Sequence, residues 1–222
     1  SLKVCAKRDP GEGLGVVVLR PDGRHAVVEY TELTPEQQQA RRPDGELVYK
    51  HGSIAIHLFA ADFLRREARV GLPLHRAHKK VSYCDAQGRT VKPEAPNAFK
   101  FEKFIFDALP DAANPVVLAT AREDEFAPVK NATGQDSAAT VRRAMMEKFA
   151  RWLRQCGVEL PRRDGELQYR VEIDPAWADG PEELAARLPT DRVVRRDLLL
   201  SETCGGGGQA CGPCSSSAAA AC

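Results

Sequence analysis

The sequence predicts a mixed α/β fold: a larger sheet flanked by helices, followed by a small α+β unit. Short apolar runs typical of strands alternate with amphipathic stretches typical of helices. The 222 residues, 43% of them hydrophobic, can bury a sizeable core. The composition also shifts near residues 157–166. We therefore expect one part over residues 1–157, a small α+β unit over 158–200 and a tail over 201–222.

The first expected elements are a hairpin and a short helix. Residues 15–19 (GVVVL) and 25–30 (HAVVEY) flank Arg-Pro-Asp-Gly, which has proline and glycine where a β-turn favours them. Thr34 then precedes Pro35, and Gln37 follows the threonine by three residues. This is the pattern of a helix N-cap with a capping box.

The middle of the chain continues the alternation. We expect strands at residues 46–49 and 53–59, and a helix at 60–68. Residues 99–109 (FKFEKFIFDAL) place apolar side chains at helical spacing, and we expect a helix there with Asn97 as its N-cap. Residues 115–121 (PVVLATA) read as a buried strand.

The last ordered elements begin with a long helix over residues 137–156. Asp136 can cap this helix, and Gly157 can end it. A strand at 169–173, a helix from Pro181 and a strand at 193–200 complete the small α+β unit. Gly, Ala, Ser and Cys dominate residues 201–222, so we expect a disordered low-complexity tail.

Charge and cysteine content exclude several classes of protein. The formal net charge is +1, which argues against a nucleic-acid partner. No apolar run approaches the roughly 20 residues of a membrane span. Seven cysteines, four of them in the tail, make a poor disulfide framework, so we expect a reduced, cytoplasmic protein. Cys211 and Cys214 resemble half of a zinc site, but no histidine completes it.

Two lysines are candidates for binding phosphate. Lys100 would lie on the first turn of the helix expected at 99–109, where free N–H groups and an ammonium can converge on an anion. Lys130 follows the strand expected at 115–121, and ligands gather at the carboxyl ends of strands in open α/β sheets. Spacing alone favours the simpler interpretation, a solvated helix lysine and a charged surface loop.

Two further groups of residues suit other ligands. Glu29 and Tyr30 end an apolar strand, and a carboxylate with a phenol suits a sugar, although a strand edge meeting solvent explains them equally. His51 and His57 would lie about 20 Å apart along a strand, too far for one metal ion. We expect His57 to be a hydrogen-bonded core histidine, and Gly52 to permit a close backbone approach.

A set of motifs in this order resembles the UDP-N-acetylglucosamine pyrophosphorylases, within the eukaryotic-type UDP-sugar pyrophosphorylase family. The resemblance runs from about Lys3 to Leu200. It rests on GLGVVV…VVEYTEL, HGSIAIHLF, HRAHKKVSY, KPEAPNAFKFEKFIFD and REDEFAPVKNATG, followed by a long helix containing RWL.

The resemblance implies a nucleotidyltransferase with a Rossmann-like mixed sheet flanked by helices and a small C-terminal domain. Such enzymes join UTP and N-acetylglucosamine 1-phosphate to give UDP-N-acetylglucosamine and pyrophosphate. By position, Lys100 matches a lysine that contacts the nucleotide phosphates, and Lys130 one that grips the sugar phosphate. The residues that match the sugar pocket are Gly15, Glu29, Tyr30, Ser53, Phe104 and Phe106. We expect both ammonium groups to point into one pocket, with Glu29 nearby.

The resemblance also has gaps. In the family, the Gly-rich nucleotide loop and the aspartate that holds Mg²⁺ lie upstream of the matched region, so the chain resembles the C-terminal half of the enzyme. No metal ligand is expected in this chain, and a homodimer is a possible assembly. Ser53 replaces an asparagine expected to bond the sugar. The sugar could therefore be glucose or galactose, or the chain could bind a nucleotide sugar without catalysis.

Overall fold

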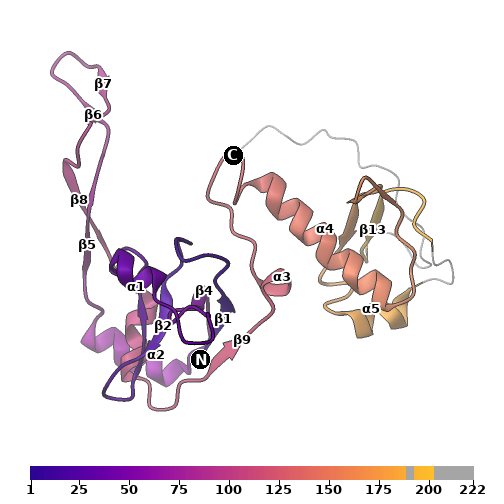
Figure 1. Cartoon of the computed structure of the whole chain (residues 1–222), viewed down its shortest axis with the longest axis horizontal. Coiled ribbons are helices and arrows are strands. Elements are labelled where there is room, and N and C mark those ends of the chain that lie inside the picture. The colour runs from indigo at the N-terminus through magenta and orange to yellow at the C-terminus, as the bar shows by residue number, and fades with distance from the viewer. Residues whose placement is uncertain (189–192, 203–222) are drawn as a thin grey trace. The chain divides into compact units, whose positions relative to one another are not determined.

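The computed structural model describes residues 1–188 and 193–202. The chain divides into two compact units, the first spanning Ser1–Arg122 and the second beginning at Glu123. Figure 1 traces both units by colour along the chain. The tail expected at 201–222 falls outside the described residues from position 203 onward.

The first unit is built on a five-stranded mixed sheet with the strand order β3-β2-β4-β1-β9. Strands β1 and β9 are parallel, and the other neighbours are antiparallel. The mixed sheet confirms the predicted fold class. The strands are β1 (Leu2–Ala6), β2 (Val16–Leu19), β3 (His25–Val28), β4 (His51–His57) and β9 (Val117–Ala119).

The predicted hairpin between β2 and β3 is confirmed. Gly23 has φ 79° and donates its N–H to the carbonyl of Arg20 at 2.9 Å. Asp22 Oδ1 accepts the N–H of Arg24 at 3.1 Å. Glycine adopts this positive φ without steric cost, which allows the tight turn. The hairpin then has the register Val16↔Val28, and this register determines which residues meet at the end opposite the turn.

One face of this sheet forms the buried core of the first unit. Leu2, Val4 and Val27 pack against Leu109, which is fully buried. Leu109 belongs to η1 (Ile105–Asp111), a 3₁₀ helix. The strand predicted at 115–121 is confirmed as β9, but its predicted burial is wrong, because Leu118 is 53% exposed. Of the seven residues in the predicted segment, only the three of β9 pair with another strand, and that strand is β1.

Two helices precede and follow β4. Helix α1 (Pro35–Gln39) begins at Thr34, whose side chain accepts the N–H of Gln37 in a complete capping box, as predicted. Helix α2 (Ala61–Val70) confirms the helix expected at 60–68 and ends at Gly71, whose φ is 82°. The strand expected at 46–49 is wrong, because this segment makes only an isolated bridge between Arg41 and Leu47.

Strands β5 (His75–Lys79) and β8 (Ala98–Glu102) form a two-stranded ribbon. Strands β6 (Tyr83–Cys84) and β7 (Thr90–Val91) make its far end, as Figure 1 shows. The helix predicted at 99–109 is therefore wrong. Phe99 and Phe101 alternate with Lys100 and Glu102 at strand spacing, and pairing with β5 satisfies their backbone groups. The 3₁₀ helix begins only at Ile105.

Asn97 consequently caps no helix. Its Oδ1 accepts the N–H of Val81 at 2.8 Å, and its Nδ2 donates to the carbonyl of Val81 at 3.0 Å. Both bonds cross the ribbon, because Val81 follows β5 while Asn97 precedes β8. A side-chain amide that could cap a helix instead bonds the backbone of the opposite strand, and it extends the ladder by two hydrogen bonds.

The second unit is organised around α4 (Ala138–Gln155), which confirms the predicted long helix. Its N-cap is Ser137 rather than Asp136: Ser137 Oγ accepts the N–H of Thr140, while Asp136 takes a positive φ of 53°. Gly157, at φ 77°, lies just past the C-cap and ends the helix as expected. The short helix α3 (Arg122–Glu125) precedes it.

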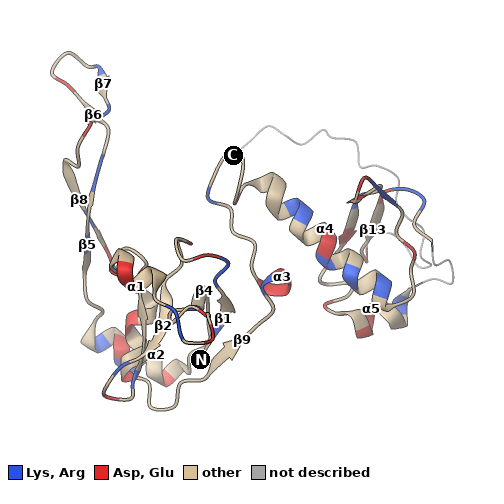
Figure 2. Ribbon diagram, viewed as in Figure 1, with Lys and Arg blue, Asp and Glu red and all other residues tan. Residues whose placement is uncertain are grey.

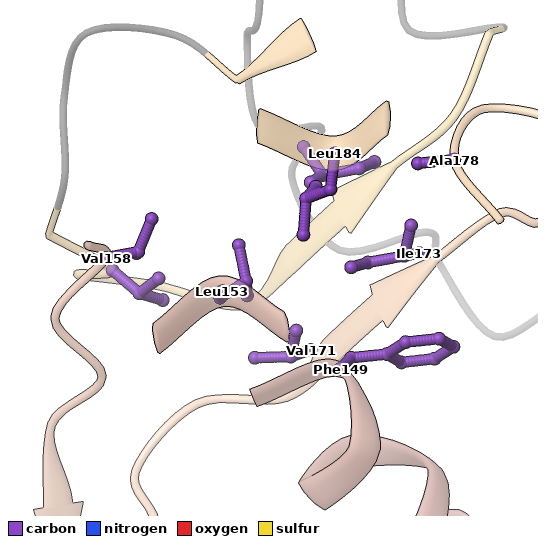
Figure 3. Close-up of a cluster of buried hydrophobic side chains, with 9 residues drawn as sticks. Phe149, Leu153, Val158, Val171, Ile173, Ala178 and Leu184 are labelled. Carbon is purple, nitrogen blue, oxygen red and sulfur yellow. The ribbon is translucent and has the colours of Figure 1, made fainter. Parts of the chain in front are cut away.

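The core of this unit packs one face of α4 against two strands and a helix. Leu153 and Leu184 are fully buried, and Val171 and Ile173 are nearly so. Figure 3 shows these side chains meeting between the elements. The elements are the parallel pair β12 (Val171–Ile173) and β13 (Leu198–Leu200), with α5 (Pro181–Arg187); β10 (Arg162–Arg163) and β11 (Glu166–Leu167) form a small hairpin.

Charged residues attach α3 to α4. Arg151 Nη2 and Asp124 Oδ1 are 2.5 Å apart, and Lys148 Nζ donates to the carbonyl of Asp124 at 2.8 Å. Figure 2 shows the acidic residues of α3 in red and the basic positions along α4 in blue. Helix α4 thus shares its unit with the segments on both sides of it, and the division expected after residue 157 stays a prediction.

Candidate functional site

Three of the predicted sugar-binding residues lie side by side at one end of the β2–β3 hairpin. Gly15 directly precedes β2 and Glu29 directly follows β3, so the antiparallel register brings them together. A Cβ atom on Gly15 would lie 2.9 Å from Glu29 Oε1. Ser53 donates its backbone N–H to the carbonyl of Gly15 at 2.8 Å. The carboxylate of Glu29 therefore packs against Gly15, and Ser53 of β4 lies next to that glycine.

The glycine at position 15 is required by this close approach. Its hypothetical Cβ would also meet Val27 Cγ1 at 2.9 Å, and Val27 belongs to the buried core. Gly52 has the same role on β4, where a Cβ would lie 2.8 Å from Leu14 Cδ1, as the sequence predicted. At both positions, side chains of neighbouring segments lie where a Cβ atom would be, and glycine leaves room for them.

Glu29 is half-buried and lies among other acids. Burial raises the pKa of this carboxyl above its ordinary value, and the nearby charges of Glu32, Glu102 and Asp107 raise it further, while His75 opposes the shift. Its backbone is fixed by a reciprocal turn, in which Glu29 N–H donates to Glu32 Oε2 at 3.0 Å and Glu32 N–H donates to the carbonyl of Glu29 at 2.9 Å. The turn fixes the backbone of Glu29, and the carboxyl of this residue can accept hydrogen bonds from sugar hydroxyls.

His75, which the sequence did not single out as a site residue, lies between two of these acids. Its Nδ1 is 3.2 Å from Glu32 Oε1, and its Nε2 is 2.9 Å from Asp107 Oδ2. Burial lowers the pKa of His75, but its hydrogen bonds to Asp107 and Glu32 and their charges outweigh burial and hold the pKa above its ordinary value. Nothing in the local spacing of HRAHKK predicts this bridge, because its partners lie 43 and 32 residues away.

The two predicted aromatic residues adjoin this histidine. The ring of Phe104 lies 5.0 Å from the ring of His75, and Phe104 stacks on Phe106 with centroids 4.8 Å apart. Phe106 packs against the buried core of the first unit. The pair thus forms an apolar wall anchored at one end in the core and at the other on the His75 ring.

Lys100 lies on β8 rather than on a helix, so the predicted phosphate site at a helix N-terminus is wrong. In the ribbon, Lys100 pairs with Ala77 and Glu102 pairs with His75, which places Lys100, Glu102 and His75 on one face. Lys100 Nζ is 2.7 Å from Glu102 Oε1, and Glu102 in turn is one of the acids that act on Glu29. Lys100 therefore belongs to the same charged face as the sugar-binding candidates.

Tyr30 is the least constrained of the predicted residues. Its side chain is 38% exposed, and its carbonyl accepts a hydrogen bond from Gln38 Nε2 at 3.0 Å. That bond fixes the direction of the chain after Glu29. A contact between the phenol and a sugar stays a prediction.

Lys130 belongs to the second unit, in a compact loop before α4. Its backbone N–H donates to the carbonyl of Asp136 at 2.7 Å, and that of Asn131 donates to the same oxygen at 3.0 Å. Ser137 Oγ donates to the carbonyl of Gly134 at 2.7 Å, which closes the loop. Lys130 thus lies beside the N-terminus of a helix of 18 residues, a place that favours anions. That Lys130 and Lys100 share one pocket stays a prediction.

Concave regions occur elsewhere in each unit. A groove of about 520 Å³ in the first unit is lined by residues that include Val17, His25, Tyr49 and His51. A groove of about 340 Å³ in the second is lined by residues that include Met145, Phe149 and Trp152. Neither contains a predicted site residue, so the site rests on the side-chain contacts described above.

His57 has an imidazole that is only partly hydrogen-bonded. His57, expected as a hydrogen-bonded core residue, instead has a buried Nε2 without a hydrogen-bond partner within residues 1–188 and 193–202. Its ring stacks on Phe59 with centroids 5.6 Å apart, and burial lowers the pKa of the imidazole. A hydrogen bond with the backbone of Ala55 also acts on the ring, so the expectation of a hydrogen-bonded histidine is met at one ring nitrogen and not at Nε2.

The described residues do not fit a Mg²⁺ ion. Across positions 1–188 and 193–202, no group of three or more His, Cys, Asp or Glu side chains is arranged to hold a metal. The acids around Glu29 are engaged with His75, Lys100 and backbone N–H groups instead.

In the same part of the chain, no helix is both long and apolar enough to cross a membrane. Within these ranges, Cys5 and Cys84 form no disulfide.

Comparison with known proteins confirms the resemblance seen in the motifs. The human UDP-N-acetylhexosamine pyrophosphorylase-like protein 1 is 43% identical over 218 residues, which cover 90% of this chain and 43% of the relative. The Xenopus tropicalis protein of the same name is 44% identical over 70% of this chain and 31% of its own length. The Saccharomyces cerevisiae UDP-N-acetylglucosamine pyrophosphorylase is 33% identical over 82% and 39%. The chain therefore spans less than half the length of these relatives.

Solved structures agree with this result. A candidate UDP-N-acetylglucosamine pyrophosphorylase from Entamoeba histolytica has a TM-score of 0.66 at 28% identity, covering 90% of this chain and 49% of its own. The UDP-N-acetylglucosamine pyrophosphorylase of Trypanosoma brucei has a TM-score of 0.63 at 24% identity, over 90% and 42%, and shows the shared fold. No model of a protein family matches the sequence.

Proposed function

Because this chain is homologous to the UDP-N-acetylglucosamine pyrophosphorylases over most of its length, we propose that it supplies the sugar-binding side of a uridylyltransferase. The reaction joins UTP and N-acetylglucosamine 1-phosphate to give UDP-N-acetylglucosamine and pyrophosphate. The observation that carries the proposal is the 43% identity to the human relative across 90% of this chain. The contacts among Gly15, Glu29 and Ser53 support it with a place for the sugar.

The proposed chemistry needs little from the protein beyond alignment and charge. A phosphate oxygen of the sugar phosphate attacks the α-phosphorus of UTP, the bond from that phosphorus to the bridging oxygen breaks, and pyrophosphate leaves with the electron pair. The attacking oxygen is already ionised, so no general base is obligatory. The ammonium groups of Lys100 and Lys130 would offset negative charge as the phosphates meet.

The described side chains suggest how the sugar would be held. Glu29 would accept hydrogen bonds from sugar hydroxyls, and the backbone of Gly15 would allow the ring to come close. The Phe104–Phe106 wall would cover an apolar face of the sugar or its acetamido group. Mg²⁺ would be held by residues outside this chain, and no step here depends on it. A cytoplasmic location, expected from the uneven spacing of the cysteines along the sequence, and a homodimer complete the proposal.

Binding of the sugar ligand tests this proposal on the chain as it stands. Isothermal titration calorimetry with UDP-N-acetylglucosamine should show saturable binding that Glu29→Ala weakens. The matched control is Glu36→Ala, which removes an exposed carboxylate from α1. Absence of binding by the wild-type chain, or equal binding by both variants, contradicts the proposal.

A different sugar is the second candidate, and Ser53 is the observation that favours it. This residue lies against Gly15 where the family has asparagine, and a hydroxyl is shorter than an amide and offers fewer hydrogen bonds. Competition between UDP-N-acetylglucosamine, UDP-glucose and UDP-galactose in the same titration separates the two. Preference for the N-acetylated sugar dismisses the alternative, and Ser53→Asn should then increase that preference.

A further inference from the structure

His75 joins its own strand to two segments that carry predicted sugar-binding residues. It begins β5, Glu32 lies in the turn after β3, and Asp107 lies in η1. The two ring nitrogens face one carboxylate oxygen each, at 3.2 Å and 2.9 Å. We call this set of three side chains the His75 clamp. Its members lie far apart in sequence, so the clamp ties together parts of the first unit that the sheet ladder does not connect.

The clamp reaches Glu29 through the backbone. One oxygen of Glu32 faces His75, and the other accepts the N–H of Glu29 at 3.0 Å. The Glu32 carboxylate therefore bonds both the imidazole of His75 and the backbone of Glu29. On its other side the His75 ring lies against Phe104, which stacks on Phe106. The same ring thus supports both the carboxylate and the aromatic wall of the proposed sugar site.

The geometry also selects a protonation state. A carboxylate only accepts hydrogen bonds, so an imidazole between two carboxylates can satisfy both only when both nitrogens carry protons. Glu32 and Asp107 flank the ring, Glu102 is its cross-strand neighbour, and Glu29 lies behind Glu32. Lys100, whose Nζ is 2.7 Å from Glu102 Oε1, lies on the same face of the ribbon. Loss of the imidazole proton would leave one nitrogen facing a carboxylate with no hydrogen between them.

We propose that His75 is a positioning residue for the sugar: as a doubly hydrogen-bonded imidazolium it holds Glu29 and the Phe104–Phe106 wall in their binding arrangement. The inference rests on the proposed function, because it assumes that this face binds the sugar. The proposal goes beyond that function because it makes the affinity for the sugar, and the pH dependence of this affinity, depend on His75, which does not itself contact the ligand. His78 offers an internal contrast, since it lies on the same strand but stacks on Phe99 on the opposite face of the ribbon.

The test measures the affinity of the full chain for UDP-N-acetylglucosamine by calorimetry between pH 6 and pH 8.5. This ligand contains no phosphate monoester, the group whose second ionisation falls near pH 6, so the diphosphate does not titrate across the range. Wild-type affinity should fall as the pH rises through the elevated pKa of His75. His75→Gln should bind about tenfold more weakly at pH 6, as expected for losing hydrogen bonds to charged groups, and should show a flat profile. His78→Gln should match the wild type.

A second variant separates positioning from a simple role in folding. Asp107→Asn keeps an acceptor but removes a charge, so it should lower the pKa of His75 in a ¹H–¹⁵N NMR titration and move the fall in affinity to lower pH by the same amount. If His75→Gln lowers only the urea midpoint, with affinity and pH profile unchanged, or if the affinity profile of Asp107→Asn stays in place, the inference is wrong while the proposed function stands. If the wild-type chain binds no UDP-N-acetylglucosamine, the proposed function fails, and the inference fails with it.

Discussion

Replacing Gly15 by alanine tests the close approach at the centre of the proposed site. The new methyl group would lie 2.9 Å from both Glu29 Oε1 and Val27 Cγ1, and 3.5 Å from the carbonyl of Val28. The end of the Glu29 side chain can move away at little cost. Val27 is only 8% exposed and belongs to the core, so the valine cannot move as easily. Overpacking of this kind costs about 1–3 kcal/mol, which we expect as the loss in free energy of unfolding.

The assay is urea unfolding followed by circular dichroism, with calorimetric binding of UDP-N-acetylglucosamine measured in parallel. Gly11→Ala is the matched control, because a Cβ there meets only Asp9 Oδ1 at an ordinary 3.5 Å. Gly15→Ala should be less stable than the control and bind more weakly, because the methyl group displaces Glu29. Equal stability and equal affinity of the two variants would refute the reasoning.

Three other predictions concern single side chains. The pKa of Glu29 is raised by burial and by nearby acids, so its contribution to the free energy of unfolding is full below the ordinary value of 4.5 and is lost as the pH rises through the raised pKa. Glu29→Gln should remove that dependence in urea unfolding at several pH values, and an unchanged profile contradicts it. Ser137→Ala removes the capping box of α4 and should cost about 1 kcal/mol by the same method, whereas Thr34→Ala at the exposed α1 should cost less. Leu153→Ala empties a fully buried position and should cost about 2–5 kcal/mol; a loss below 1 kcal/mol would argue against the described core.

Local sequence signals predicted several elements well. The Pro-Asp-Gly turn, the capping box of Thr34, and Gly157 after α4 each act within a few residues, and the structure confirms all three. Gly52 was also predicted correctly, because a Cβ there would lie 2.8 Å from Leu14 Cδ1. Such signals depend on backbone geometry that neighbouring residues determine.

Signals that depend on distant partners were misread. Residues 99–109 fit a helical period as well as an alternating one, and pairing with His75–Lys79 decides in favour of a strand. Residues 115–121 are apolar enough for a buried strand, yet β9 is an edge strand of three residues. In both cases the deciding contact is tertiary and leaves no trace in the local pattern.

The candidate site shows the same division. The motifs identified Gly15, Glu29 and Ser53, and the structure brings these three together. His75 was missed because its importance lies in partners more than 30 residues away. Side-chain bridges of this length become visible only when the fold places three segments around one ring.

The most direct test of the account is a crystal structure of the protein with UDP-N-acetylglucosamine bound. We predict that the sugar lies against Gly15, Glu29 and the Phe104–Phe106 wall, with the diphosphate next to the ammonium group of Lys100. A sugar bound elsewhere, or a diphosphate that does not contact Lys100, would contradict the proposed site.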